Sequence, residues 1–471
     1  MVGETIYFGR FISAPQPDEL LIRTGAVLVN GNDGKGVIKK ADWTVTSSSD
    51  AASKFGVEAP VVVAKNSGFF FPGFIDTHIH APQYPNVGIF GKSTLLDWLT
   101  TYTFPLESSL GNAKSPMYKD TVSPPDPLTR AKAVYNRVVS RTLANGTTTA
   151  SYYATIHVDS TNMLADITFA RGQRAYIGRV CMDRPEMCPD YYRDESTEQT
   201  IANTKASIAH CKSLDASGEL VAHIVTPRFA PSCLPQTLTQ LGELAKEEDL
   251  RIQTHISENL NEVKLVKELF PDQSSYADVY DHHGLLTPKT ILAHAVHLSK
   301  EEMRLVKAKK SKISHCPNSN SALGSGLCPV RELLDEGIEV GLGTDVSGGY
   351  SASILDAVRN ACIVSRHVGF LHDGDSRYNV GVAEGLWLAT MGGAKVVGME
   401  GRLGGFEERM LWDVQEIALG EVETDGQGED SDVDIFGWES WENRVAKWVW
   451  NGDDRNVRRV WVGGRLVHER R

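Results

Sequence analysis

Five residues of metal-binding type stand at the ends of short apolar runs in this 471-residue chain. They are four histidines and one aspartate: His78, His80, His255, His294 and Asp345. In a barrel of parallel strands, the carboxyl ends of all strands meet at one mouth. Neutral imidazoles together with one carboxylate are the ligands of a catalytic divalent metal ion such as Zn²⁺. The sequence therefore predicts a metal centre at the mouth of a barrel.

The spacing of His78 and His80 supports this prediction only weakly when it is taken alone. Side chains alternate between the two faces of a strand, so His78 and His80 point the same way and can reach one ion. A single histidine such as His255 or His294 is more often a hydrogen-bonded structural residue. The ordered set of five residues at strand ends favours the metal centre over that alternative.

The elements that must position these residues follow from hydrophobic patterns. Strand-like runs alternate with helical patterns such as 261–269, 353–369 and 383–398, and Ser299 and Glu302 form a capping box. We predict eight strands, at 71–80, 147–154, 175–182, 221–228, 251–255, 290–294, 312–315 and 338–345. This alternation is typical of βα units around a parallel sheet, so we predict an α/β fold of the (β/α)₈ barrel type.

Both flanks of the barrel have a different character. The first seventy residues contain short strand-like runs, and the C-terminal segment ends in a predicted hairpin around Gly463 and Gly464. The acidic, Gly-rich tract 421–434 is expected to be a solvated loop.

Composition excludes several classes of function. The net charge of −12 argues against binding to nucleic acids and anionic membranes, which require basic surfaces. No apolar run approaches the roughly 20 residues that span a bilayer. The first residues lack the basic and apolar regions of a signal peptide, so we expect none. Seven scattered cysteines indicate free thiols in a reducing cytoplasm.

Several motifs resemble those of the amidohydrolase superfamily, in its mononuclear deaminase branch. They are PGFIDTHIH at 72–80, THISE at 254–258, AH at 293–294, HCPNSN at 315–320 and GTD at 343–345. Binuclear members carry a modified lysine on the fourth strand. The run 221–228 has no lysine, so we expect one Zn²⁺ per subunit.

The resemblance also implies a domain organisation. A barrel at 72–395 would carry a small β-sandwich assembled from 1–71 and 396–471, and the subunit would form a homodimer. The Gly-Lys-x-Ala-Asp motif that usually follows the barrel is replaced here by EERMLWD at 407–413. This departure concerns the sandwich and leaves the catalytic residues untouched.

The roles of the remaining acidic and imidazole groups follow from the expected chemistry. Glu258 lies three residues after His255, which predicts a general acid and base beside the metal. The alternative is a solvated carboxylate at a helix start. Asp345 is expected both to bind the metal and to accept a proton from water. His294 is expected either to bind the metal or to hold the nucleophilic water, and the sequence leaves both open.

Further segments, at 81–84, 96–107, 179–183 and 226–229, are similar to those of superfamily members that act on guanine. The resemblance implies that Gln83 and Arg228 contact the substrate and that Phe229 stacks on its ring. The alternatives are a polar loop amide, a surface arginine and a core phenylalanine. His315 and Asn318 either shape their loop or contact the substrate.

The expected function is zinc-dependent hydrolytic deamination of guanine to xanthine and ammonia, a step of purine catabolism. One alternative is a related enzyme acting on another heterocycle, such as another aminopurine or pyrimidine deaminase or a triazine chlorohydrolase. A second is a barrel that binds a purine without turnover. Glu258 and Asp345 argue against the second, because a binding protein needs neither.

Overall fold

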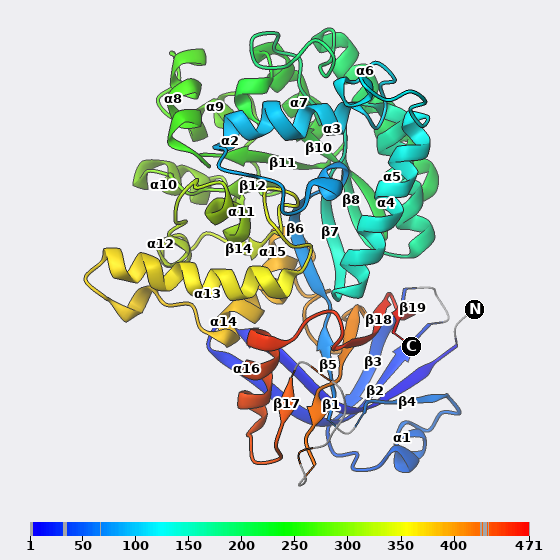
Figure 1. Cartoon of the computed structure of the whole chain (residues 1–471). Helices are drawn as coiled ribbons and strands as arrows, with labels where there is room; N and C mark the ends of the chain where they lie inside the picture. Colours follow the sequence, from blue (N-terminus) through cyan, green and yellow to red (C-terminus); the bar gives the residue numbers. More distant parts are fainter. Residues whose placement is uncertain are drawn as a thin grey trace.

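The computed structural model describes residues 3–31, 35–65, 67–423, 426, 431 and 433–470. Half of the acidic tract 421–434 lies outside these ranges. A barrel wrapped by helices forms one part, and a twisted sheet that holds both termini forms the other (Figure 1). Residues from the two ends of the chain therefore lie side by side, below the barrel in this view.

The barrel consists of parallel strands in chain order. They are β6 (Phe74–His80), β7 (Thr147–Tyr153), β8 (Arg174–Gly178), β10 (Val221–Pro227), β11 (Arg251–Ile256), β12 (Thr290–His294), β13 (Lys312–His315) and β14 (Val340–Leu342). The short β9 (Val180–Cys181) extends the third strand and pairs with β10. The α/β barrel predicted from the sequence is thereby confirmed.

The first predicted strand begins later than expected. Phe71 and Pro72 belong to another strand, β5 (Phe69–Pro72), which pairs with the terminal sheet. Gly73 separates β5 from β6, and a Cβ atom there would lie 2.2 Å from the side chain of Thr148. Only glycine lets the chain pass from the sheet into the barrel this close to β7.

The barrel closes at the residues predicted to bind metal. The backbone N–H of Asp345 donates to the carbonyl of His78 (2.9 Å), and the N–H of His80 donates to the carbonyl of Val346 (3.1 Å). These bonds join the end of β6 to the segment that follows β14. Barrel closure and the position of three candidate ligands thus depend on the same short stretch of backbone.

Helices surround the barrel between the strands. The longer ones are α4 (Pro127–Ala144), α5 (Val158–Arg171), α6 (Thr197–Leu214), α7 (Pro235–Glu247), α8 (Leu260–Leu269), α9 (Tyr276–His282), α10 (Lys300–Ala308) and α13 (Ile354–Leu371). Shorter ones are α11 (Pro317–Ala322), α12 (Val330–Asp335), α14 (Val382–Trp387) and α15 (Gly393–Val396). The capping box is confirmed at the start of α10. The predicted helix 383–398 is interrupted by a π-helical turn, η6 (Leu388–Gly392).

An irregular helix lies across the mouth of the barrel. It runs through α2 (Leu95–Trp98), a π-helical turn η2 (Leu99–Thr103) and α3 (Phe104–Ser108), and Figure 1 shows it over the strand ends. Pro105 lacks an N–H group and cannot continue a regular helix, and the widened turn occurs directly before α3. A 3₁₀ turn, η1 (Ala81–Asn86), connects β6 to this covering segment.

The terminal sheet is built from both ends of the chain. Its strands are β1 (Thr5–Gln16), β2 (Glu19–Asn30), β3 (Val37–Asp42), β4 (Val61–Val63), β5, β15 (Val414–Ile417), β18 (Val457–Val462) and β19 (Arg465–Glu469). The predicted hairpin at Gly463 and Gly464 joins β18 to β19. Further elements near it are α1 (Ser48–Phe55), β16 (Gly420–Glu421), β17 (Asp434–Ile435) and α16 (Trp441–Asn451). The domain limits at 71/72 and 395/396 stay a prediction.

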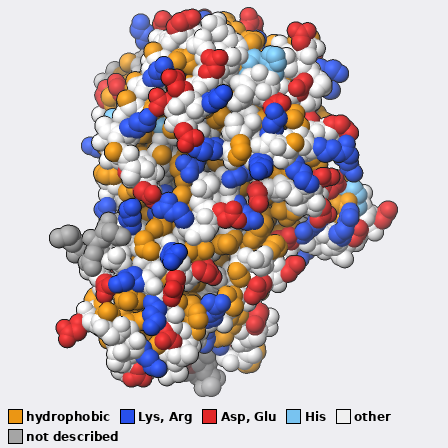
Figure 2. Space-filling model, turned by 180° about the vertical axis from the view of Figure 1, so that it is seen from behind, with side chains coloured by type: hydrophobic (Ala, Val, Ile, Leu, Met, Phe, Trp, Pro, Cys, Tyr) orange, Lys and Arg blue, Asp and Glu red, His pale blue; other side chains and the backbone are white. Residues whose placement is uncertain are grey.

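The distribution of surface charge and the state of the cysteines match the expectations from the composition. On the face drawn in Figure 2, Lys and Arg side chains are interspersed with Asp and Glu. Among the helices that the structure describes, none has the length and apolar character needed to cross a membrane. All seven cysteines are buried and unpaired.

Candidate active site

Four of the five predicted ligands converge at the barrel mouth. His78 Nε2 and His80 Nε2 lie 3.1 Å and 3.4 Å from Asp345 Oδ1, and His80 Nε2 lies 3.2 Å from His255 Nε2. One ligand atom from each of the four residues lies within 4.8 Å of the others. Donor atoms bonded at 2.0–2.1 Å to one tetrahedral ion stand about 3.3–3.4 Å apart. The four side chains therefore fit a single ion such as Zn²⁺.

The protonation of these groups also suits a metal. Burial lowers the pKa of His78, His80 and His255, which keeps the imidazoles neutral. His255 Nδ1 lies 2.6 Å from the carbonyl oxygen of Arg228, so Nδ1–H donates there and the Nε2 lone pair faces the other ligands. Burial alone would raise the pKa of Asp345, but the neighbouring histidines outweigh it and lower this pKa.

Asp76 ties the ends of β6 and β14 together beneath the candidate metal site. Its Oδ1 accepts from the backbone N–H groups of Thr344 (3.0 Å) and His78 (3.2 Å), and its Oδ2 accepts from the Thr344 hydroxyl (2.5 Å). Burial raises the pKa of Asp76 to about 7. This carboxyl fixes the backbone on both sides of the barrel closure.

His294 occupies a different place from the other histidines. Its Nε2 lies 3.4 Å from Glu258 Oε2 and 3.7 Å from Asp345 Oδ2, and its Nδ1 lies 2.8 Å from Asn320 Oδ1. Burial lowers the pKa of His294, but Glu258 and Asp345 outweigh it and raise this pKa. His294 can therefore share a proton with two carboxylates, and its Nε2 is not among the four converging ligand atoms.

Glu258 is buried beside this histidine. Only 2% of it is exposed, so the alternative of a solvated carboxylate is wrong. Burial raises its pKa to about 7, and the Ser325 hydroxyl donates to its Oε1 (2.8 Å). A carboxyl group that titrates near neutrality can both give and take a proton at physiological pH.

Four non-glycine residues at the mouth have left-handed backbones. They are Ser257, His294, Ala295 and Asp345, with φ of 48°, 76°, 52° and 48°. Such conformations cost on the order of 1–3 kcal/mol each and persist where the surrounding structure imposes them. The strands thus end in turns that direct the functional side chains inward.

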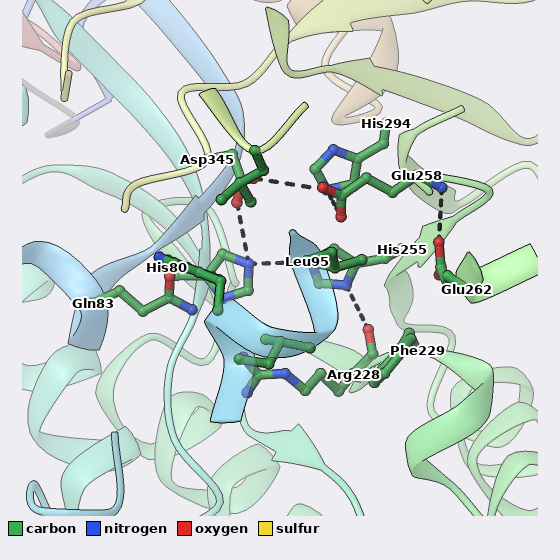
Figure 3. Close-up of a pocket in the computed structure, with 13 residues that line it drawn as sticks. His80, Gln83, Leu95, Arg228, Phe229, His255, Glu258, Glu262, His294 and Asp345 are labelled. Carbon is green, nitrogen blue, oxygen red and sulfur yellow. Dashed lines mark hydrogen bonds and ion pairs between the residues drawn. The ribbon is translucent and has the colours of Figure 1, made fainter. Parts of the chain in front are cut away.

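A pocket opens beside the candidate ligands (Figure 3). Gln83, Arg228 and Phe229, which are predicted to contact the substrate, line this pocket together with His80, His255, Glu258, His294 and Asp345. Its apolar walls come from the covering helix and the loop after α11: Leu95, Trp98, Leu99 and Leu323. Arg228 is 2% exposed, so the alternative of a surface arginine is wrong. A pocket with apolar walls and a few polar groups suits a small heterocycle.

The sequence interpretation missed Glu107, the buried partner of both Gln83 and Arg228. Glu107 is the last residue of the segment 96–107. Its position directly after the apolar residues Phe104, Pro105 and Leu106 is a sequence signal for a buried carboxylate. His315 and Asn318 are buried outside the pocket lining. Among the residues that the structure describes, neither side chain has a hydrogen-bond partner, so loop-shaping bonds from them are absent.

Comparison with known proteins decides the family. Residues 69–467 match the sequence profile of the amidohydrolase family. The chain belongs to the amidohydrolase family. A probable guanine deaminase of Schizosaccharomyces pombe is 48% identical over 470 residues, which cover 99% of this chain and 84% of that protein.

Two further amidohydrolase relatives support the comparison. The guanine deaminase of Homo sapiens is 42% identical over 403 residues, which cover 85% of this chain and 83% of that protein. The crystal structure of guanine deaminase from C. acetobutylicum with bound guanine superimposes with a TM-score of 0.85 at 31% identity, covering 99% and 100% of the two chains.

Proposed function

We propose that this amidohydrolase catalyses the hydrolytic deamination of guanine to xanthine and ammonia. The observation that carries the proposal is a pocket beside the four converging ligand atoms that is lined by Glu258, His294, Gln83 and Arg228. The similar proteins named above are guanine deaminases, one with guanine bound in its active site, which supports the same substrate.

We assign the metal ligands to His78, His80, His255 and Asp345, with one Zn²⁺ per chain. A bound Zn²⁺ supplies Lewis acidity that lowers the pKa of a bound water toward about 7. The fourth strand, β10, has no lysine to bridge a second ion. His294 is one of the five predicted ligands, but we assign it to holding the nucleophilic water, because its Nε2 faces Glu258 and Asp345.

Acid and base catalysis is assigned to Glu258 and Asp345. Asp345 is held ionised and can accept the proton of the attacking water. Glu258 can give its proton to a ring nitrogen as the carbon is attacked. It can then take the proton of the hydroxyl group that has added and pass it to the amine, which leaves as ammonia while the carbonyl forms. The hydroxyl of Ser325 keeps the Glu258 carboxyl turned toward His294.

Substrate binding is assigned to the opposite side of the pocket. In Figure 3, Gln83 and Arg228 lie across the pocket from Glu258 and His294. This separation lets a purine present its carbonyl oxygen to Gln83 and Arg228 while its amino-bearing carbon faces the metal site. Phe229 is placed to pack on the ring.

We further propose a cytoplasmic homodimer that acts in purine catabolism. Seven buried, unpaired thiols support a reducing compartment. The homodimer rests on the family resemblance alone, and light scattering of the purified protein tests it. A monomeric mass at micromolar concentration would contradict it.

The substrate proposal is tested on a panel of guanine, adenine, cytosine and a chlorinated triazine, each incubated with the zinc-loaded protein. Ammonia release is measured for the three bases, and chloride release is measured for the triazine. We expect turnover of guanine at least about a hundredfold above that of adenine and the triazine, because a site built to bind a carbonyl oxygen rejects analogues that lack it. Absence of ammonia from guanine would sink the proposal. A Glu258→Gln variant with full activity would contradict the assigned acid–base role.

A further inference from the structure

A single buried carboxylate organises the substrate-binding side of the pocket. Glu107, at the end of the covering helix, is 0% exposed. Its Oε1 accepts from Gln83 Nε2 (2.7 Å) and Arg228 Nη2 (3.1 Å). Its Oε2 accepts from Arg228 Nη1 (2.7 Å) and the Tyr192 hydroxyl (2.7 Å).

Four hydrogen bonds exhaust the acceptor capacity of this carboxylate. Each carboxylate oxygen offers about two lone-pair sites, and both sites on both oxygens of Glu107 are occupied. Glu107 therefore has no remaining site for substrate, water or metal. Its effect on the reaction must pass through the side chains that it binds.

The amide of Gln83 is locked in one orientation by two neighbours. Its Nε2 donates to Glu107, and its Oε1 accepts from the backbone N–H of Ser347 (3.2 Å). A carboxylate can only accept hydrogen bonds and a backbone N–H can only donate them. A flipped Gln83 amide would therefore place its oxygen against the Glu107 carboxylate and its NH₂ group against the N–H of Ser347. The second N–H of Gln83 Nε2 remains for the substrate.

Arg228 is locked from two sides. Glu107 accepts one hydrogen bond from each terminal nitrogen of Arg228. The centroid of the Phe104 ring lies 5.1 Å from the guanidinium carbon. Because Phe104 and Glu107 both belong to α3, the covering helix holds the guanidinium as one unit. The N–H groups that remain on Arg228 can only donate.

We propose that Glu107 is a specificity-determining positioning residue, which fixes Gln83 and Arg228 as a pair of hydrogen-bond donors. This donor pair accepts a heterocycle with a carbonyl oxygen and rejects one with an amino or C–H group at that place. The inference rests on the proposed function and extends it, since it explains how a pocket for guanine excludes an aminopurine without the carbonyl.

The test compares guanine with 2-aminopurine, which keeps the amine and lacks the carbonyl oxygen. KM and kcat for guanine and the inhibition constant of 2-aminopurine are measured on zinc-loaded wild type and Glu107→Gln. An amide in place of Glu107 directs an N–H at one of the donors. We expect kcat/KM for guanine to fall about a hundredfold while the inhibition constant changes less than about threefold.

The outcomes separate the inference from the proposed function. Wild type without guanine turnover would remove the function and the inference together. With active wild type, equal weakening of both ligands in Glu107→Gln would overturn the inference, because a merely structural role damages the whole pocket. Guanine turnover within about threefold of wild type would also overturn it.

If Glu107→Gln fails to fold, a second variant tests whether Glu107 positions Gln83 and Arg228. Tyr192→Phe removes one donor to Glu107 and leaves Gln83 and Arg228 intact. We expect kcat/KM for guanine to fall about fivefold with little change for 2-aminopurine. Tyr152→Phe is the matched control, since that hydroxyl bonds Gln173 outside the pocket (2.9 Å). Identical behaviour of the two tyrosine variants would overturn the inference.

Discussion

The backbone N–H of Asp345 donates to the carbonyl of His78 over 2.9 Å, and the two side chains meet at 3.1 Å. The last strand of the barrel is thus joined to the first by the residues assigned to the metal. Asp76 supports this junction from below, through bonds to Thr344 and to the backbone of His78. The contacts that close the barrel therefore also bring His78 and Asp345 together at the candidate metal site.

The role of His294 is tested by its replacement with alanine. We expect His294→Ala to keep about one zinc per chain and to lose about 10²–10⁴-fold in kcat, because a residue that positions the water acts in proton transfer. Metal analysis and steady-state kinetics on the same sample check this. His80→Ala serves as the comparison, since removal of an assigned ligand is expected to lower the zinc content. Loss of zinc from His294→Ala would make it a ligand instead.

The contact between the barrel and the terminal sheet is expected to depend on Asp413. Arg174 of β8 donates to Asp413 through Nε (3.0 Å) and Nη2 (3.2 Å), and the Gly463 N–H donates to the same carboxylate (2.8 Å). Asp413→Ala leaves a buried, unpaired guanidinium, which costs about 3–5 kcal/mol of unfolding free energy.

Urea unfolding measures this cost, with Asp454→Ala as the matched control. Asp454 also bridges the two parts of the chain, through Arg141 (3.0 Å), but the pair is partly exposed. Such pairs contribute about 0–1 kcal/mol. Equal destabilisation by the two variants would contradict the importance assigned to the buried pair.

A buried histidine outside the active site predicts how stability depends on pH. Burial, with a smaller contribution from Arg179, lowers the pKa of His223 from 6.5 to about 3. The unfolded chain binds a proton below pH 6.5, whereas the folded chain excludes it until about pH 3. Stability therefore falls as the pH drops through this window, by at most about 1.4 kcal/mol per pH unit from this residue.

Replacement of His223 by phenylalanine removes this titration. We expect the unfolding free energy of His223→Phe to decline less steeply than that of wild type between pH 6 and 4, on the order of 1 kcal/mol per unit. Chemical unfolding at several pH values gives both slopes, and other titrating groups cancel in their difference. Parallel slopes would show that His223 takes up its proton equally in both states.

Much of the barrel was predictable because its strands are short apolar runs with polar residues at one end. That pattern is enough to place His255, His294 and Asp345 at strand ends from the sequence alone. The boundary at Gly73 was not predictable, because Phe69–Pro72 continues the apolar run of β6 although it pairs with the terminal sheet.

The site was less predictable where function depends on contacts between distant segments. Gln83, Glu107, Tyr192 and Arg228 lie far apart in the chain and meet only in the folded structure. The two possible roles of His294 also could not be separated from spacing. Its left-handed backbone and its bond to Asn320 direct the ring toward Glu258, and neither feature has a local sequence signal.

Zinc titration of the metal-free protein, followed by the rate of xanthine formation from guanine, tests the central claim most directly. The account predicts that activity rises linearly and reaches a plateau at one zinc per chain, because four converging ligand atoms hold one ion. A plateau at two equivalents would contradict the single metal site. Absence of xanthine at every zinc concentration would contradict the proposed function.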